Sequence, residues 1–363
     1  MTATAGNNRQ YYPALDGLRG LAILMVVAYH NFGFVNQSFF GWLGVDLFFV
    51  LSGFLITTIL LNDFGKPDFL RNFFMRRVLR IFPLYYLSLI IFLFVAAPLT
   101  SPELNWKYYS DNQIWLWFYL ENWLYIFKPS GHTNLLHHYW SLAVEEQFYL
   151  LWPFIILLLK KPKRLLLFIS SLFLLVIAFR FTVWQYEIKN IAYYNLYTFS
   201  RIDGICIGCM IALISRINPR FITNHTASIV LFFAGMNFLF FFFNQSHDFW
   251  FPYLAVAGYS TFAMLFGLLV YSATRNDTRI ITFIFTSRIL IFFGKISYAF
   301  YILHWPIYVF IKTYAHPKVK EYFPANSSQF VIAIAGTLAA ILLAWISTRY
   351  FESHFLKIKK KYT

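Results

Sequence analysis

Ionisable side chains interrupt several long apolar stretches of this sequence, and the first stretch holds Asp16, Arg19 and His30. Arg19 and His30 lie eleven residues apart within residues 14–33. On a helix this spacing corresponds to about 16 Å along the axis, or roughly three turns. Because a charged group in an apolar span is costly, each is a candidate functional residue until a structural partner explains it. We expect Arg19 and His30 to serve the two ends of one substrate channel.

His30 has the side chain of a general base that removes a proton from a hydroxyl group. A neighbouring carboxylate would fix the tautomer of its imidazole and raise its basicity. The sequence offers Asp46 in the second apolar stretch, and Glu145 and the adjacent Glu146 at the start of the fourth. We expect one of these carboxylates beside His30. A hydrogen-bonded packing role is the alternative for a lone histidine in an apolar span.

Three arginines, Arg76, Arg77 and Arg80, stand just before the third apolar stretch. On a helix Arg76 and Arg80 share a face, with Arg77 adjacent. Guanidinium groups bind phosphates through charge-assisted hydrogen bonds, so this cluster is a candidate site for a nucleotide-bearing donor. Anchoring of the chain at the cytoplasmic boundary is the alternative.

Other polar residues lie further along the chain. Arg201 and Asp203 occur together in the sixth apolar stretch, where we expect an internal ion pair with a structural role. His304 precedes Pro306, which should kink the ninth helix, and the sequence leaves the role of this histidine open. Either group could line a cavity.

Cys206 and Cys209 are the only cysteines, and they share one helix face. A metal site needs further ligands nearby, and none is evident in the sequence. We therefore predict small packing residues and no metal.

The elements that position these residues follow from composition. At 363 residues, with 59% hydrophobic residues and a mean hydropathy of +0.57, the chain is too apolar for a water-soluble domain. Stretches of about 20 apolar residues are long enough to cross roughly 30 Å of hydrocarbon. We predict an all-α polytopic bundle of about ten transmembrane helices, a single membrane domain over 1–363 with a basic cytoplasmic tail over 352–363. The spans are expected near 14–33, 42–62, 80–98, 138–159, 165–184, 196–214, 227–243, 250–271, 289–311 and 328–350.

The net charge of +15 indicates topology rather than nucleic-acid binding, because the basic residues sit in short blocks between spans. If both termini are cytoplasmic, twenty lysines and arginines fall in inner segments and six in outer loops. The six are Lys107, Lys128, Lys189, Lys312, Lys318 and Lys320. Basic residues favour the inner side, so we expect both termini in the cytoplasm.

The longest expected outer loop, residues 100–137, is rich in tryptophan and tyrosine. These rings favour the headgroup layer and indicate an interfacial or re-entrant anchor, with an acceptor-binding lid as the alternative. The rings are Trp106, Tyr108, Tyr109, Trp115, Trp117, Tyr119, Trp123 and Tyr125.

Taken in order, these motifs resemble the acyltransferase-3 family of bacterial integral membrane acyltransferases. The segment 15–22 followed by His30 is similar to the family's Arg-x10-His motif. The segments 41–54, 77–83, 140–149, 201–204 and 297–306 follow in the family's order. The resemblance therefore covers nearly the whole chain.

The resemblance implies O-acylation, usually O-acetylation from acetyl-CoA, in the bacterial cytoplasmic (inner) membrane. The implied acceptor is an extracytoplasmic glycan or its lipid-linked precursor, such as O-antigen of lipopolysaccharide, capsule or exopolysaccharide. By resemblance His30 is the catalytic base, Arg19 its motif partner, Glu145 the family's carboxylate, and Arg77 and Arg80 the pair associated with the acyl-CoA. The chain looks like the stand-alone form without an extracytoplasmic esterase-like domain.

In the expected mechanism, Arg77 and Arg80 hold the nucleotide end of acetyl-CoA at the inner face. The pantetheine arm passes Arg19, and His30 deprotonates the acceptor hydroxyl; a covalent acyl-histidine is a variant. A transporter or flippase of an anionic lipid-linked sugar is the rival, since intramembrane charges also mark substrate pathways. No paired halves with matching broken helices are evident, which counts against that rival.

Overall fold

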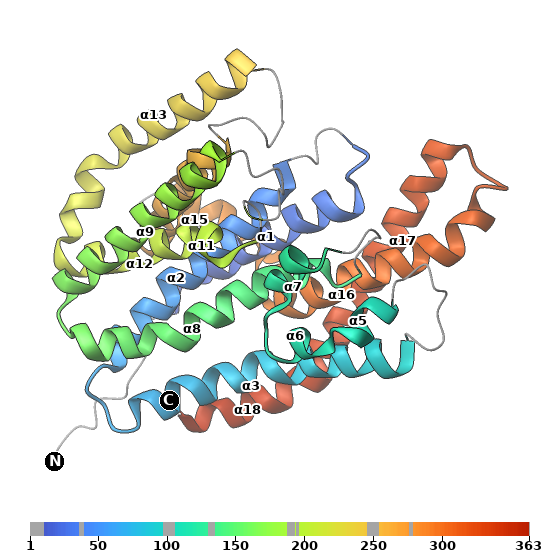
Figure 1. The fold of residues 1–363 in the computed structure, drawn as a ribbon, viewed down its shortest axis with the longest axis horizontal. Coiled ribbons are helices and arrows are strands. Elements are labelled where there is room, and N and C mark those ends of the chain that lie inside the picture. Colours follow the sequence, from blue (N-terminus) through green and yellow to red (C-terminus); the bar gives the residue numbers. More distant parts are fainter. Residues whose placement is uncertain are drawn as a thin grey trace.

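The computed structural model of the protein describes residues 11–35, 40–96, 106–129, 135–186, 193, 196–244, 254–275 and 279–362. Within these ranges every regular element is a helix, so the predicted all-α class is confirmed. Most of the longer helices run side by side along the long axis of the molecule (Figure 1). They are α1 Pro13–Asn31, α2 Leu43–Asp63, α3 Phe69–Ile90, α8 Trp140–Leu159, α9 Pro162–Gln185, α12 Asp203–Ile217, α13 Pro219–Asn244, α14 Tyr259–Arg275, α16 Arg288–Val319 and α17 Ala325–Ile346.

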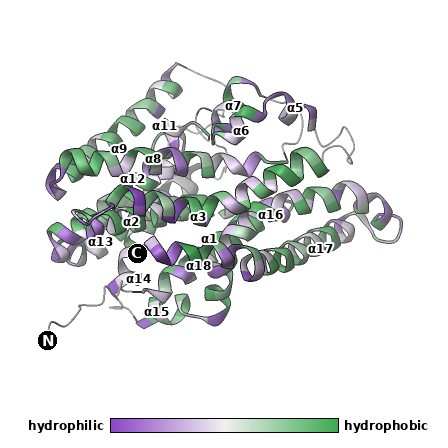
Figure 2. Cartoon of the chain, turned by 90° about the horizontal axis from the view of Figure 1, so that it is seen from below, coloured by the Kyte–Doolittle hydropathy of each residue, from purple (hydrophilic) through white to green (hydrophobic). Residues whose placement is uncertain are grey.

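Among the described residues, eight helical segments are long and apolar enough to cross a membrane, and each coincides with one of the ten predicted spans. The other two predicted spans correspond to α1, which carries Asp16 and Arg19, and to α12, which has 15 residues. Hydrophobic residues extend along the long helices, and many hydrophilic ones gather near helix ends (Figure 2). The polytopic bundle expected from composition is therefore confirmed.

Two predicted segments differ from the structure. The span expected over 196–214 is broken, because the short α11 (Thr198–Arg201) ends before Ile202 and α12 begins at Asp203. The expected basic tail, 352–363, continues α17 as helix through Ser347–Glu352 and α18 (Ser353–Lys359). In Figure 1, α18 lies beside α3 and packs against it, so the tail is part of the bundle.

Glycines let the inner helices approach closely. A Cβ atom on Gly53 of α2 would lie 2.0 Å from the carbonyl oxygen of Ile205 on α12. A Cβ atom on Gly17 of α1 would lie 1.8 Å from the carbonyl oxygen of Phe285, which ends α15 (Arg279–Phe285). Side chains at these positions would force the backbones apart. The tight contacts set the positions of α1, α2 and α12; the buried Asp46 and Asp63 lie on α2 and the buried Asp203 on α12.

The described residues of the expected outer loop 100–137 include three short helices, α5 (Trp106–Asp111), α6 (Gln113–Trp117) and α7 (Glu121–Phe127). Its rings divide into two groups. Tyr109, Tyr119 and Tyr125 are buried in the main core, where the ring of Tyr119 stacks 4.1 Å from that of Tyr85. The tryptophans remain partly exposed, as an interfacial anchor requires. Lys189 and residues 100–105 and 130–134 lie outside the described residues.

Candidate active site

Two neighbouring cavities lie within the bundle, and the first is lined by arginines. This arginine cavity has a volume of about 100 Å³. Helices α1, α2, α3, α8 and α16 all contribute to its wall. Its polar lining residues are Arg19, Ser52, Arg77, Arg80, Ser141, Glu145, Tyr149, Ser297, Tyr298 and Tyr301.

Arg77 and Arg80 line this cavity, and neither makes an ion pair within the described part of the chain. Arg77 lies 5.3 Å from the ring centroid of Tyr149, and Arg19 pairs with Asp16 at 2.9 Å. Two guanidinium groups without carboxylate partners among the described residues leave an excess of positive charge at the cavity.

Arg76, predicted to act with these arginines, is instead held away from the cavity. Its guanidinium pairs with Asp63 at 2.7 Å and donates to the carbonyl oxygen of Tyr362 at 2.9 Å. The side chain is 6% exposed. Arg76 therefore fastens the end of the helical tail to α3, and the arginine cluster of the cavity is smaller than expected.

Glu145 and Glu146 face different spaces, although they are adjacent on α8. Glu145 lines the arginine cavity, where it accepts hydrogen bonds from Ser52 at 2.7 Å and Tyr149 at 3.1 Å. Glu146 lines a separate side pocket with Arg77 and Tyr119. Of the two carboxylates, Glu145 is the one placed to contact a molecule in the arginine cavity.

The second cavity has a volume of about 420 Å³ and is lined by histidines and aromatic rings. It is called the histidine cavity below. Small-molecule sites usually enclose about 300–1,000 Å³, so this cavity is large enough to hold a small molecule. The lining residues are Val26, Tyr29, His30, Trp42, Val45, His137, His138, Trp140, Leu196, Arg201, Tyr259, Tyr301 and Trp305. No residue of the described helices α5, α6 or α7 is among them.

His30 lies against another histidine rather than against a carboxylate. Its Nδ1 is 2.8 Å from Nε2 of His304, and the two rings stack at 5.1 Å. His304 is fully buried in α16. The expected neighbours are elsewhere, since Glu145 lines the other cavity and Asp46 binds Arg201. The prediction of a carboxylate partner for His30 is therefore wrong within the described residues.

His138 was not among the predicted site residues, yet it also lines the histidine cavity. Its ring centroid is 6.4 Å from that of His30 and 5.1 Å from that of His304. Three imidazoles from α1, α16 and the turn before α8 thus gather in one place. The pair His137 and His138 before an apolar span was the signal in the sequence.

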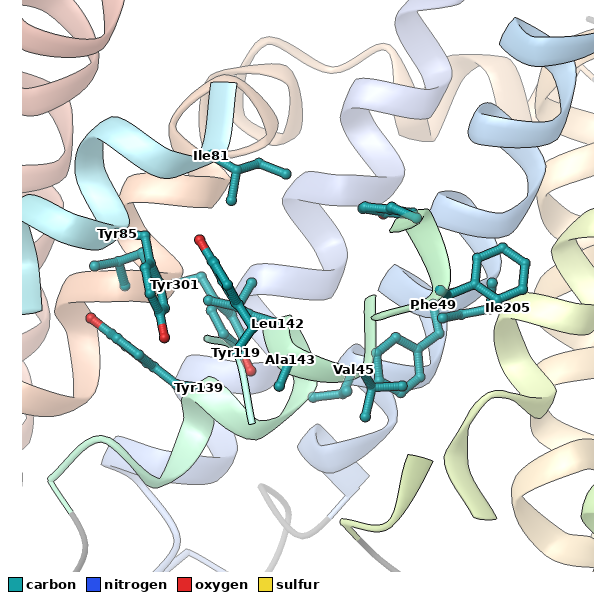
Figure 3. Packing of buried hydrophobic residues seen from close by; sticks show 14 of the residues in the cluster. Val45, Phe49, Ile81, Tyr85, Tyr119, Tyr139, Leu142, Ala143, Ile205 and Tyr301 are labelled. Carbon is teal, nitrogen blue, oxygen red and sulfur yellow. The ribbon is translucent and has the colours of Figure 1, made fainter. Parts of the chain in front are cut away.

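Val45 and Tyr301 line both cavities and so form part of the wall between them. Figure 3 shows both residues near Leu142 of α8. The Tyr301 hydroxyl donates to the carbonyl oxygen of His138 at 2.7 Å and lies 2.6 Å from the Ser141 hydroxyl. The expected channel from Arg19 to His30 is therefore present as two compartments with a shared wall.

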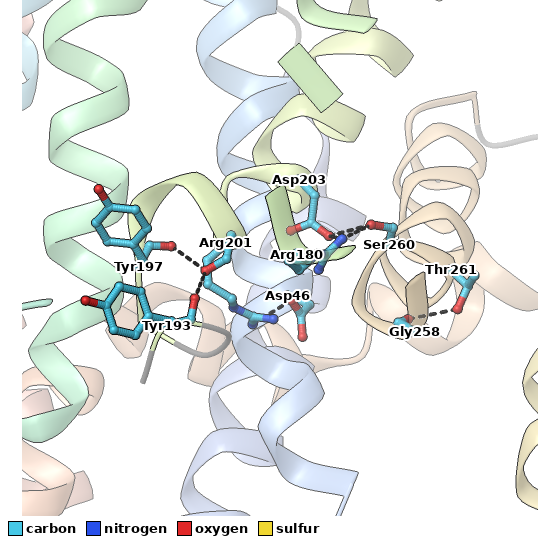
Figure 4. Close-up of polar contacts among 10 residues, drawn as sticks. Asp46, Arg180, Tyr193, Tyr197, Arg201, Asp203, Gly258, Ser260 and Thr261 are labelled. Carbon is cyan, nitrogen blue, oxygen red and sulfur yellow. Dashed lines mark hydrogen bonds and ion pairs between the residues drawn. The ribbon is translucent and has the colours of Figure 1, made fainter. Parts of the chain in front are cut away.

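The buried ion pairs connect different helices from those expected. Arg201 does not pair with Asp203; it pairs with Asp46 of α2 at 2.8 Å. Asp203 pairs with Arg180 of α9 at 3.1 Å, and Ser260 bridges them (Figure 4). The side chains of residues 201 and 203 point in different directions at the break before α12. The two crossed ion pairs and Ser260 therefore connect this break to α2, α9 and α14.

The two cysteines are buried and unoxidised, and Cys209 lies 3.6 Å from the carbonyl oxygen of Gly53 at the α2–α12 contact. Their small side chains fit that close approach. Among the described residues, no cluster of histidine, cysteine and acidic side chains could hold a metal ion.

The fold and cavities define a multi-pass membrane protein with arginines and histidines in adjoining internal sites. The chain belongs to the acyltransferase domain family (acyltransferase 3), which matches residues 12–349. This match confirms the resemblance seen in the sequence motifs.

Two similar proteins illustrate the family. The chain is 31% identical to the peptidoglycan O-acetyltransferase OatA of Listeria monocytogenes, over 98% of this chain and 58% of that protein. It is 32% identical to the O-acetyltransferase OatA of Staphylococcus aureus, over 96% of this chain and 58% of that protein. The chain thus spans 58% of the length of these curated relatives. No solved structure matches the chain at a significant level.

Proposed function

We propose that this protein is a membrane O-acetyltransferase that moves an acetyl group from acetyl-CoA to a hydroxyl group of a cell-envelope glycan. The observation that carries the proposal is the shared wall between a cavity with two available arginines and a cavity with a histidine base. The donor binds on one side of that wall and the acceptor on the other. The site of action is the cytoplasmic membrane of a bacterium.

On the donor side, Arg77 and Arg80 bind the phosphates of acetyl-CoA. Their lack of ion-pair partners in the described part of the chain leaves their donor groups available. The cavity volume of about 100 Å³ suits a thin arm rather than a nucleotide, so the nucleotide stays at the arginines and the pantetheine enters. Glu145 and Ser52 offer polar contacts along that arm.

On the acceptor side, the histidine cavity offers aromatic faces and a few polar groups, a lining suited to a sugar ring with several hydroxyls. Trp140, Tyr259 and Trp305 provide the faces. The Listeria relative is named for peptidoglycan, so a sugar of that polymer is the first acceptor to test. The sugars of O-antigen, capsule and exopolysaccharide are the next acceptors to test.

The chemical step begins when the acceptor oxygen attacks the thioester carbonyl. A carbon–oxygen bond forms, the carbon–sulfur bond breaks, and His30 takes the hydroxyl proton. The imidazolium then returns this proton to the departing thiolate, so the products are an ester and free coenzyme A.

Replacing the proposed base tests this step. The variant His30→Gln should lose about 10²–10⁴-fold in acetyl-transfer rate, because glutamine keeps hydrogen-bonding capacity but does not take a proton near neutral pH. Acetyl-CoA affinity should stay unchanged, since His30 lies outside the arginine cavity. Purified protein in lipid nanodiscs would be assayed for transfer and, separately, for donor binding.

The matched control is His225→Gln on the exposed surface of α13, which should transfer at the wild-type rate. Mass spectrometry of envelope glycans from cells with and without the gene would identify the acceptor. Near-normal transfer by His30→Gln would contradict the proposed base. Failure of the wild-type protein to turn over acetyl-CoA, with movement of a lipid-linked sugar instead, would contradict the proposed activity.

A further inference from the structure

We propose that His304 is a positioning residue that holds His30 in the one tautomer able to act as a base toward the histidine cavity. Only its expected effect on the acetyl-transfer rate rests on the proposed function. The structural content of this inference stands on the contacts between the buried imidazole of His304 and the partly buried imidazole of His30. The two rings form a dyad that takes the place of the carboxylate–imidazole pair common in other hydrolases and transferases.

The tautomer of His304 follows from its partners. Its Nδ1 faces the carbonyl oxygens of Tyr301 at 2.8 Å and Phe300 at 3.1 Å. A carbonyl oxygen can only accept a hydrogen bond, so Nδ1 of His304 carries the proton. A neutral imidazole has one such proton, and Nε2 of His304 is therefore an acceptor.

The tautomer of His30 follows in turn. Its Nδ1 lies 2.8 Å from Nε2 of His304, which offers only a lone pair, so Nδ1 of His30 carries the proton. The remaining lone pair is on Nε2 of His30. Because His30 is only partly buried and lines the histidine cavity, Nε2 is the nitrogen left to meet an acceptor hydroxyl.

The third imidazole is kept out of this arrangement by the same helix. Pro306 has no backbone N–H, so the carbonyl oxygen of Ile302, four residues earlier, lacks its usual helical partner. His138 Nε2 lies 3.3 Å from that oxygen and donates to it. His138 is thus bound to α16 and does not compete with His304 for Nδ1 of His30.

The dyad also accommodates the charge that develops during transfer. When Nε2 of His30 takes the acceptor proton, the imidazolium still donates from Nδ1 to His304, and the positive charge is shared across the hydrogen bond. The carbonyl oxygens of Tyr301 and Phe300, which accept from Nδ1 of His304, carry partial negative charge that stabilises this positive charge. No carboxylate among the described residues is bonded to either ring, so this backbone pair provides the stabilisation.

Two amide variants of His304 separate this role from simple packing. In His304→Gln, the side-chain amide reaches the position of Nε2 and its oxygen can accept from Nδ1 of His30. In His304→Asn, the amide ends near the position of Nδ1 and cannot reach His30. Both variants are polar and neutral, so they differ mainly in the hydrogen bond to be tested.

We expect His304→Gln to retain kcat within about tenfold, and His304→Asn to lose on the order of 10²-fold in kcat with unchanged acetyl-CoA affinity. Equal kcat values for the two variants, at equal folded fractions, would overturn the positioning role. A rise in KM at constant kcat would also overturn it, since that pattern belongs to a binding residue.

Nuclear magnetic resonance of protein with ¹⁵N,¹³C-labelled histidine in bilayers gives a readout that needs no turnover. The spectrum of His30→Gln identifies the His30 signals by their absence. We expect a proton on Nδ1 of His30 in wild type and His304→Gln, and a mixture of tautomers in His304→Asn. A wild-type His30 protonated on Nε2 would overturn the inference even if transfer activity is normal. Conversely, the expected tautomer with no transfer would leave the dyad standing and contradict the proposed function.

Discussion

Lys359 adds a positive charge near the arginines that the sequence motif predicts. It lies on α18, which packs against α3, and it is in the electrostatic field of Arg19, Arg76, Arg77 and Arg80. Like charges gathered in this way repel one another and are stabilised when a polyanion binds between them. We therefore expect Lys359 to join Arg77 and Arg80 in binding the phosphates of acetyl-CoA, the proposed donor.

Substitution of Lys359 should weaken acetyl-CoA binding slightly, and substitution of Arg77 and Arg80 should weaken it more. Lys359→Gln should lower acetyl-CoA affinity about three- to tenfold, or roughly 0.7–1.4 kcal/mol. The double variant Arg77→Gln and Arg80→Gln should cost on the order of 1.5–3 kcal/mol for each charge-assisted hydrogen bond that it removes. Calorimetry with acetyl-CoA would measure both.

The matched control for the tail is Lys357→Gln, because Lys357 is exposed on the same helix. It should leave affinity unchanged. If Lys357→Gln weakens binding as much as Lys359→Gln, the effect is a general attraction of the basic tail and not a specific interaction. Unchanged affinity in the arginine double variant would return Arg77 and Arg80 to a role in membrane anchoring.

At the residue scale, the sequence showed which ionisable side chains line the cavities more reliably than it showed which residues those side chains contact. His30, Arg77 and Arg80 stood out because ionisable side chains are costly in or beside apolar spans. The partner of His30 could not be identified, since His304 is 274 positions away and only packing of α1 on α16 brings the rings together. Arg180 was overlooked as a lone charge in the fifth span, although the same cost argument applies to it.

Among the elements, the break between α11 and α12 has the largest effect on the site. The break directs Arg201 toward Asp46, beside the histidine cavity, while Asp203 at the start of α12 meets Arg180. Both pairs are almost completely buried, so each charge depends on its partner. The sequence predicted an ion pair here but assigned a continuous helix, because Ile202 gives no sign of a break.

Removal of one member of a crossed pair should destabilise the bundle strongly. Arg180→Met leaves Asp203 buried without its ion-pair partner, which should cost about 3–5 kcal/mol in the free energy of unfolding. The double variant Arg180→Met with Asp203→Asn should recover much of that stability, because no unpaired charge remains. Unfolding in mixed micelles would be followed by the decrease in helical circular dichroism.

Arg164→Met is the control on the same helix, since Arg164 is exposed near the start of α9. It should change the free energy of unfolding by less than about 0.5 kcal/mol. An Arg180→Met protein as stable as wild type would show that the pair contributes nothing to the fold.

For the whole molecule, eight of the ten predicted spans coincide with described helices that are long and apolar enough to cross a membrane, while the ends of the helices could not be predicted. Apolar windows locate a helix in the bilayer, but they do not mark where it continues into water. The third span begins at Phe69 rather than near residue 80, and the last helical segment runs to Tyr362. The polar ends of both segments are helical because α18 and α3 pack against each other. Local hydropathy does not reveal such a tertiary contact.

The orientation of the bundle remains a prediction from the distribution of basic residues. A reporter fused after Thr363 should be active in the cytoplasm, and one inserted in the loop 100–137 should be active outside, because twenty lysines and arginines lie in the expected inner segments and six outside. Paired phosphatase and fluorescent-protein fusions in cells would measure this. Both reporters active on one side would contradict the ten-span topology.

The wall between the two cavities also affects whether protons can leak across the membrane. A continuous water-filled passage would let protons cross and discharge the membrane potential, which is worth about 2.3 kcal/mol per charge at 100 mV. Val45 and Tyr301 stand between the compartments that such a passage would join. In the proposed reaction, the acetyl group passes the same side chains. If transfer takes the proposed route, insulation and transfer both depend on Val45 and Tyr301, and the arm of the proposed donor has to fill any space that opens between them.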